Sequence, residues 1–269
     1  MINPEENGNN QRWWGEFKLP ANSMGCWHVG PLQLWVQRLA SDWRVAWRAG
    51  EELMQPVAEV KLPLPLQAPE SGMTVARFSF RDTDQPLRLI PTLADRPVVV
   101  RPDMPLYIPS GETITLFVST TLWVRIFVGH AAPLTEIPTL RPSDTWFGPN
   151  TRSGEMCYAS RTLAHTSIKD VVPRPHRAIT PVQIRNHAAD ALAVERLSVP
   201  VPLLTLSVNE RGHFWTQSVT LERRAHADNA VLQLGDMSLP GTVSLQQVCD
   251  PRQVEDDRTV LRALSRFFG

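Results

Sequence analysis

The stretch TITLFVSTTLWVRIFV, residues 113–128, decides how this sequence folds. Apolar side chains recur at its even-numbered positions, with Leu116 and Val124 as examples. An apolar residue at every second position is typical of a strand that buries one face. We therefore expect strands at 113–118 and 121–128.

The same period of two recurs along the chain. It predicts further strands, at residues 74–80, 181–186, 201–208 and 214–221. The polar loop Asn209–Gly212 lies between the last two, and its closing glycine favours a hairpin. The sequence contains 24 prolines, which end helices and mark strand ends. A mainly β protein follows from these patterns.

The segment Pro31–Gly50 fits two structures. Trp43, Val45 and Trp47 alternate as in a strand after a turn at Ala40–Asp42. Helical spacing is also present, in Leu32, Trp35, Val36, Leu39, Trp43 and Trp47. We predict strands, because tryptophan and valine favour pleated and half-buried surfaces.

The C-terminal segment has a helical pattern. Asp250 is a suitable cap and Pro251 suits the first turn. Apolar residues follow at helical spacing, namely Val254, Leu261, Leu264 and Phe268. The pattern predicts an amphipathic helix over residues 251–267.

Two parts of the chain have similar sequence patterns. Trp13–Gly15 and Trp146–Gly148 both read aromatic, aromatic, glycine, and each precedes a cysteine–aromatic pair. Pro63–Leu66 recurs in style as Pro200–Leu203. The displacement is about half the chain each time, which suggests an internal duplication. Coincidence among common dipeptides of β proteins is the alternative.

These observations predict a fold of two β-sandwich or barrel-like halves with a C-terminal amphipathic helix. We expect a first β domain over residues 1–138 and a second over 139–269, the latter carrying the helix at 251–267. The proline-containing stretch 130–143 is a plausible linker between them.

Composition narrows the class of protein. Basic and acidic residues number 27 each, so no net charge attracts nucleic acid or an anionic membrane. Three cysteines in a chain of this length are typical of reduced thiols. Residues 1–11 lack the features of a signal peptide. The most apolar segment, Leu116–Val128, is too short to span a bilayer. We expect a soluble, cytoplasmic protein without membrane insertion.

Three histidines recur at intervals of eleven residues, and they are His165, His176 and His187. Strands that return to one end of a barrel could bring them together as metal ligands. No carboxylate falls at a matching interval, so we expect neither a metal nor another cofactor.

Two further groups are candidates for binding. Arg174 and Arg177 belong to a basic, proline-rich loop that could hold a phosphate or carboxylate through guanidinium forks. A solvated connection is the other interpretation of this loop. Phe267 and Phe268, at the end of the predicted helix, are candidates for contact with a partner.

Known catalytic motifs are absent from the sequence. It contains no Gly-x-Ser-x-Gly, no Gly-x-x-x-x-Gly-Lys and no Gly-x-Gly-x-x-Gly. We therefore predict no catalytic residues, and an enzyme is not favoured.

Several segments carry a family resemblance. Trp27–Trp35 and Asp42–Ala46, with the later Thr180–Val182 and Val194–Leu197, resemble an uncharacterised prokaryotic family, the domain of unknown function four-three-two. The resemblance implies no assigned reaction and no known functional residues. The resemblance also implies that mechanosensitive channels are candidate partners.

Two functional hypotheses follow. The first is a non-enzymatic binding or accessory protein that engages a protein partner, or a second copy of itself, through a β surface or the C-terminal helix. The second is a small-ligand-binding protein or metal-dependent enzyme with a pocket between the two halves. We prefer the first, because charge balance and the lack of catalytic motifs both fit it.

Overall fold

The computed structural model describes residues 12–50, 57–130, 132–148, 152, 154–224, 229–237, 244–254 and 259–263. Strands account for 57% of the structure and helical residues for 3%, which confirms the mainly β class. The helical residues form two 3-10 turns, η1 (Ile168–Asp170) and η2 (Val201–Leu203). No helix in the described ranges is long and apolar enough to cross a membrane.

Contacts divide the chain into two compact units. Unit 1 comprises Met1–Pro91 and Val124–Leu140, and unit 2 comprises Thr92–Trp123 and Arg141–Gly269. The units are interleaved in sequence, so the division does not coincide with a single cut after residue 138. Independent folding of residues 1–138 and 139–269 stays a prediction.

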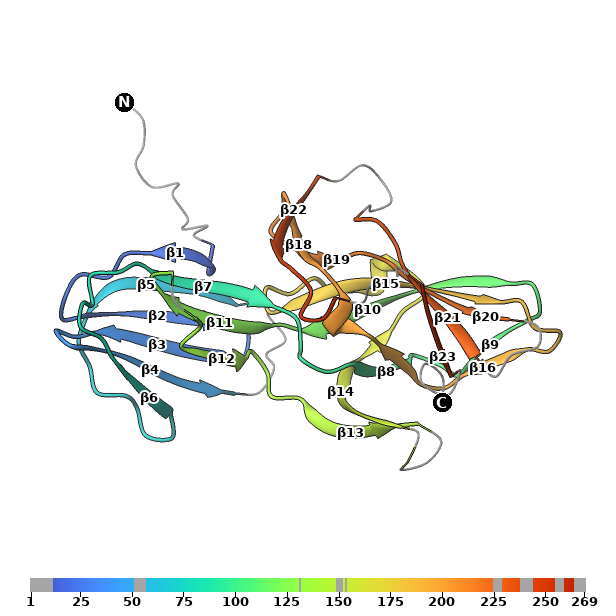
Figure 1. The fold of residues 1–269 in the computed structure, drawn as a ribbon, viewed down its shortest axis with the longest axis horizontal. Coiled ribbons are helices and arrows are strands. Elements are labelled where there is room, and N and C mark those ends of the chain that lie inside the picture. The colour runs from blue at the N-terminus through green and yellow to red at the C-terminus, as the bar shows by residue number, and fades with distance from the viewer. Residues whose placement is uncertain are drawn as a thin grey trace. The chain divides into compact units, whose positions relative to one another are not determined.

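Unit 1 is built from two sheets (Figure 1). The first has the order β1-β7-β11-β12, and its strands are β1 (Gly15–Phe17), β7 (Leu87–Thr92), β11 (Trp123–Val128) and β12 (Thr135–Pro138). The second has the order β5-β2-β3-β4-β6, with β2 (Ser23–Val29), β3 (Leu32–Arg38), β4 (Asp42–Ala49), β5 (Ala58–Pro65) and β6 (Thr74–Ser79).

Tryptophans supply much of the core of unit 1. Trp27 and Trp43 are 1% and 0% exposed, and Phe17 of β1 meets Trp27 edge to face at 5.2 Å. This ring pair places side chains of the two sheets in direct contact. The hairpin of β3 and β4 confirms the prediction of strands for Pro31–Gly50.

Unit 2 is organised around β15 (Arg177–Asn186). The large sheet has the order β22-β18-β19-β15-β20-β21-β23, and β10 pairs with the other side of β15. The strands of this sheet are β10 (Thr113–Thr121), β18 (Leu206–Asn209), β19 (Phe214–Thr216), β20 (Val219–Arg223), β21 (Asn229–Leu234), β22 (Leu245–Cys249) and β23 (Thr259–Ala263). Leu116, Val182 and Leu221, from three neighbouring strands, are fully buried and form part of its core.

Two smaller sheets complete unit 2. One has the order β13-β14-β8-β17, with β8 (Val98–Pro102), β13 (Ser143–Phe147), β14 (Glu155–Ala164) and β17 (Leu197–Val199). The other pairs β9 (Leu106–Ile108) with β16 (Leu192–Val194).

The stretch 113–128 forms two strands, as predicted, and the chain passes from one unit to the other between them. β10 pairs along its whole length with β15, from Thr113↔Arg185 to Thr121↔Arg177. β11 instead lies between β7 and β12 in unit 1. The alternation predicts two strands, but Thr121, assigned to the second, belongs to β10, and β11 begins at Trp123. The alternation also carries no information about which sheet each strand joins.

The predicted hairpin at Asn209–Gly212 is also confirmed. β18 and β19 pair antiparallel across it. The Asn209 side chain accepts hydrogen bonds from the backbone N–H groups of Arg211 and His213, and Gly212 has φ 78°. A positive φ strains any residue with a Cβ, which explains the glycine. The predicted strand 201–208 is wrong at its start, where residues 201–203 form η2.

The predicted C-terminal helix is wrong. Residues 259–263 form β23, which pairs antiparallel with β21 from Asn229↔Ala263 to Gln233↔Thr259. An open strand edge offers hydrogen bonds to a segment far away in sequence, and this pairing overrides a helical spacing of apolar residues. Residues 255–258 and 264–269 of the predicted helix region lie outside the described residues.

The segments with similar sequence patterns in the two halves have different structures. Pro63–Leu66 includes the end of β5, whereas Pro200–Leu203 includes η2. Gly15 begins β1, whereas Trp146 and Phe147 end β13. Duplication therefore stays a prediction that these local structures do not support.

A carboxylate–arginine cluster lies at the start of β4. Asp42 is 4% exposed, and its Oδ2 accepts hydrogen bonds from the Nε groups of Arg44 and Arg77 at 3.0 and 2.9 Å. Arg44 and Arg77 lie directly opposite each other on β4 and β6. The Asp42 charge therefore compensates two like charges that would otherwise repel.

This cluster predicts a pH-dependent contribution to stability. Burial raises the pKa of Asp42, but the hydrogen bonds from the two arginines outweigh it and lower the pKa overall. Such a group stabilises the fold above its unfolded-state pKa of about 3.9, and the contribution is lost as pH falls through the lower folded-state pKa. We expect Asp42→Asn to destabilise the protein at pH 7, with a smaller difference from wild type at pH 2.

Urea denaturation at both pH values measures this difference. Glu59→Gln is a matched control, because Glu59 makes an exposed ion pair with Lys61. A stability difference for Asp42→Asn that is the same at pH 7 and pH 2 would contradict the prediction.

Candidate functional site

One face of the sheet β13-β14-β8-β17 carries an unusual combination of side chains. On β8, alternation places Val99 and Arg101 on the same face. The parallel pairing of β14 with β8 shifts register, so that Ala159↔Val99 is followed by Leu163↔Arg101. β14 therefore has two residues more than β8 across this interval, which is a bulge. Bulges re-aim side chains and are frequent beside functional sites.

A small pocket lies at this bulge. We call it the arginine pocket; its volume is about 100 Å³ and it is lined by Val99, Arg101, Thr145, Ala159, Ser160, Thr162, Leu163 and Arg196. Three of these residues carry hydroxyl groups. The Ser160 and Thr162 hydroxyls lie 2.9 Å apart, and the Thr162 N–H donates to Ser160 Oγ at 3.1 Å.

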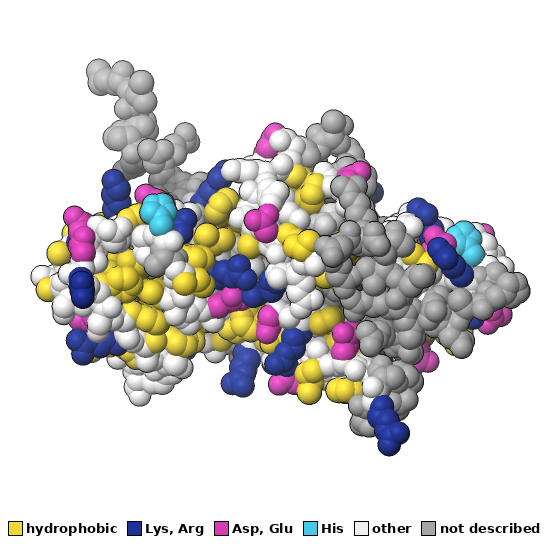
Figure 2. Space-filling view, in the orientation of Figure 1, with side chains coloured by type: hydrophobic (Ala, Val, Ile, Leu, Met, Phe, Trp, Pro, Cys, Tyr) yellow, Lys and Arg dark blue, Asp and Glu magenta, His cyan; other side chains and the backbone are white. Residues whose placement is uncertain are grey.

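Neither arginine of this pocket is engaged with an anionic group of the described residues. Within the described part of the chain, the Arg101 guanidinium has no hydrogen bond or ion pair, and the Arg196 guanidinium contacts only the Phe147 ring. On the face drawn in Figure 2, basic and acidic side chains are interspersed. The pocket is thus a local positive site in a protein without net charge.

Packing beneath the pocket orients Arg196. Its Cζ lies 5.5 Å from the centre of the Phe147 ring, a cation–π distance. Phe147 belongs to a buried cluster with Val99 and Cys157. Burial raises the pKa of the Cys157 thiol to about 11, so it is protonated at neutral pH and is not a nucleophile. The cluster is structural, and it supports the guanidinium that lies over it.

A second pocket adjoins the first. We call it the apolar pocket; its volume is about 270 Å³ and it is lined by Ser119, Thr162, Leu163, His165, Asp170, Val171, Val172, Arg174 and Arg177. Thr162 and Leu163 line both pockets. Arg177 is 2% exposed; its Nε donates to Ser119 Oγ at 3.0 Å and its Nη2 to Thr162 Oγ1 at 2.9 Å.

The three predicted histidines do not converge. His165 pairs with Phe117 of β10 and its Nδ1 lies 3.9 Å from Asp103 Oδ2. His176 is buried immediately before β15, and His187 is exposed immediately after it. A strand of ten residues separates these two histidines by about 33 Å, far beyond the reach of one metal ion. In the described ranges, no three His, Cys, Asp or Glu side chains form a group that could hold a metal.

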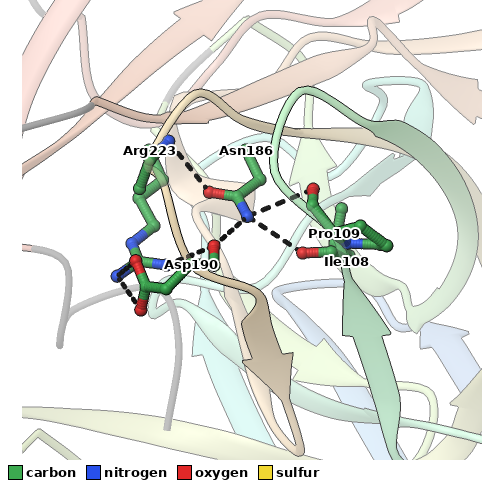
Figure 3. Close-up of polar contacts among 6 residues, drawn as sticks. Ile108, Pro109, Asn186, Asp190 and Arg223 are labelled. Atoms are coloured by element: carbon green, nitrogen blue, oxygen red, sulfur yellow. Dashed lines mark hydrogen bonds and ion pairs between the residues drawn. The ribbon is translucent and has the colours of Figure 1, made fainter.

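His187 directly follows Asn186, which is the centre of a structural network (Figure 3). The Asn186 side chain is fully buried, and its amide donates to the carbonyls of Ile108, Pro109 and Asp190 at 2.9, 3.2 and 2.8 Å. Asp190 is exposed and forms an ion pair with Arg223 at 3.1 Å, which lowers the pKa of Asp190. This amide ties the end of β15 to β9 and to the loop after residue 186.

The two arginines of the predicted arginine loop have different roles. Arg177 is committed to hydrogen bonds inside the protein, while the half-buried Arg174 lines the apolar pocket. The structure therefore brings together His165, Arg174 and Arg177, all lining this pocket. Phe267 and Phe268 lie outside the described residues.

Comparison with known proteins identifies the family. A family model described as "Protein of unknown function (DUF432)" matches residues 13–268. The chain belongs to this family. The resemblance inferred from Trp27–Trp35 and the later segments is confirmed. No curated protein and no solved structure matches the chain.

Sequence reasoning missed the two arginines of the arginine pocket. Arg101 follows three valines in an apolar run, and an arginine at that point is a weak sign of a charged site at a strand end. Arg196 lies in Val194–Leu197, a segment that carried only the family resemblance. Their proximity depends on the antiparallel pairing of β17 with β8, which places Leu197 opposite Val100 and has no signature in the sequence.

Proposed function

We propose that this protein binds a small phosphate- or carboxylate-bearing ligand in the arginine pocket. The observation that carries the proposal is the pair Arg101 and Arg196, which line one pocket with three hydroxyl groups and have no anionic partner among the described residues. Arginine forks match carboxylate and phosphate geometry, and charge-assisted hydrogen bonds are the strong ones.

The size of the pocket fits such a group. Its volume of about 100 Å³ is about three times the ~30 Å³ that one water occupies in the liquid. The Ser160 hydroxyl can rotate to donate to an oxyanion, whereas the Thr162 hydroxyl donates to the Ser119 carbonyl at 2.7 Å. Arg196, held over Phe147, loses little side-chain freedom when it binds.

The residue types support binding over acid–base catalysis. Guanidinium and hydroxyl groups donate hydrogen bonds, but they do not change their protonation state near neutral pH. Binding of a small ligand belongs to the second hypothesis, and only the non-enzymatic role is shared with the preferred one. The pocket belongs to unit 2 alone, in contrast to the pocket between halves that the second hypothesis required. Engagement of a protein partner through a β surface stays a prediction.

Isothermal titration calorimetry with inorganic phosphate and with acetate tests the proposal. We expect Arg101→Gln and Arg196→Gln each to weaken phosphate binding by about ten-fold or more, because a hydrogen bond to a charged group contributes about 1.5–3 kcal/mol. Ionic strength is held constant, since screening alone changes the affinity of exposed charges.

Arg211→Gln is the matched control. Arg211 is exposed in the β18–β19 hairpin and lines neither pocket, so phosphate affinity should not change. Thermal unfolding of each variant checks that the fold is intact. Wild-type protein that binds neither anion, or pocket variants that bind like wild type, would exclude this function.

A further inference from the structure

The two pockets of unit 2 share a boundary with unusual exposure. Thr162 and Leu163 line both pockets, and the Leu163 side chain is 45% exposed between them. Val172, on the other side of the apolar pocket, is 61% exposed. Exposed apolar side chains that line a concavity offer a surface on which the apolar part of a ligand can be buried.

The floor of the apolar pocket is already satisfied. The Arg177 Nη2 donates to the Ser119 carbonyl at 2.8 Å and to Thr162 Oγ1 at 2.9 Å, and Thr162 Oγ1 donates to the same carbonyl at 2.7 Å. These polar groups bond to one another, so an apolar ligand over them strands no buried donor or acceptor. Val171 adds a buried apolar wall, anchored against Ile179 and Trp215.

The two pockets of unit 2 differ in size. The apolar pocket is about 270 Å³ and the arginine pocket about 100 Å³. The smaller, arginine-containing pocket suits a compact charged group, while the larger one can take a chain or ring.

We infer that the ligand is an amphipathic anion. Its phosphate or carboxylate head lies at Arg101 and Arg196, and its apolar part crosses Leu163 into the apolar pocket. This inference rests on the proposed function of the arginine pocket. A free amphiphile and a membrane lipid share this chemistry, and the test below separates them.

Calorimetry with inorganic, ethyl and hexyl phosphate tests the inference. Burial of one methylene contributes about 0.8 kcal/mol, or about fourfold in affinity. Hexyl phosphate is therefore expected to bind more than ten-fold tighter than ethyl phosphate. Equal affinities of hexyl and ethyl phosphate would overturn the inference and leave the anion site intact. Failure of all three compounds to bind would overturn the proposed function itself.

A pair of valine variants locates the apolar part. Val172→Asn should reduce the hexyl-to-ethyl affinity ratio at least threefold, because it places an amide on the wall of the pocket. Val75→Asn is the control, since Val75 is a similarly exposed valine (49%) on β6 in unit 1, and it should leave the ratio unchanged. A ratio that Val172→Asn does not alter would overturn the placement.

Co-sedimentation with vesicles distinguishes the two sources of ligand. Vesicles of phosphatidylcholine with one-fifth phosphatidic acid present the same head on a lipid. If the protein sediments with these vesicles and both Arg101→Gln and Arg196→Gln weaken this binding, the inference is supported and the source of the ligand is a lipid. No sedimentation, with tight binding of hexyl phosphate, supports it with a free amphiphile.

Discussion

Replacing Trp27 with alanine is expected to lower the free energy of unfolding by about 4 kcal/mol, the usual range for a large aromatic side chain removed from a core. Trp27 is 1% exposed and packs edge to face on Phe17. Its ring also covers Gly25, where an added Cβ would lie 2.5 Å from the ring carbon Cη2. The space left by alanine is bounded by a sheet on each side, so it cannot collapse easily.

Urea denaturation followed by circular dichroism measures this loss. Gly25→Ala supplies the matched test of close packing: alone it should cost about 1–3 kcal/mol through overpacking. In the Trp27→Ala background the same change should cost much less, because the ring it collides with is gone. A loss below about 1 kcal/mol for Trp27→Ala would contradict the packing described here.

The second large effect is expected at Asn186. Asn186→Ala should lower the free energy of unfolding by about 3 kcal/mol, because it removes a fully buried amide that donates to three backbone carbonyls, one of them on the buried Ile108. The reason is geometric: one buried amide satisfies Ile108, Pro109 and Asp190 together. No substituted apolar side chain can replace those donors.

Asn186→Asp separates hydrogen bonding from volume. The aspartate side chain has nearly the same shape, but its ionised oxygens would face the carbonyl oxygens of Ile108 and Pro109. Its folded-state pKa should therefore be raised above the unfolded value, and the variant should be more stable at pH 4 than at pH 7. Thermal unfolding at the two pH values measures this. Asp190→Ala is the control, and it should have a much smaller effect because that carboxylate is exposed. Equal losses for Asn186→Ala and Asp190→Ala would refute the role of the amide.

Local chemistry explains the predictions that held. The hairpin at Asn209–Gly212 depends on an asparagine that bonds its own turn and a glycine that tolerates φ 78°. Pro31–Gly50 formed strands because tryptophan and valine suit a pleated surface, although helical spacing was also present. Each of these depends on neighbours within a few residues, so sequence alone carries enough information.

The binding site was only partly predictable. The arginine loop pointed to the correct region, since Arg174 and Arg177 line the apolar pocket. Arg177 donates hydrogen bonds to Ser119 and Thr162 inside the fold, and the proposed anion site has two other arginines, Arg101 and Arg196. Arg101 and Arg196 are far apart in sequence, and only the sheet that joins β8 to β17 brings their strands side by side.

The stretch 113–128 shows what the sequence determines by itself and what only the tertiary structure decides. By itself the sequence determined that these residues form strands, and which of their side chains are buried, because a period of two has only one compatible geometry. Tertiary structure alone decided that β10 joins β15 while β11 joins the sheet of β7 and β12. It likewise decided that residues 259–263 extend β21 as a strand. Backbone hydrogen bonding between strands is the same for almost any pair of sequences, so the choice of partner follows from the packing of the whole chain.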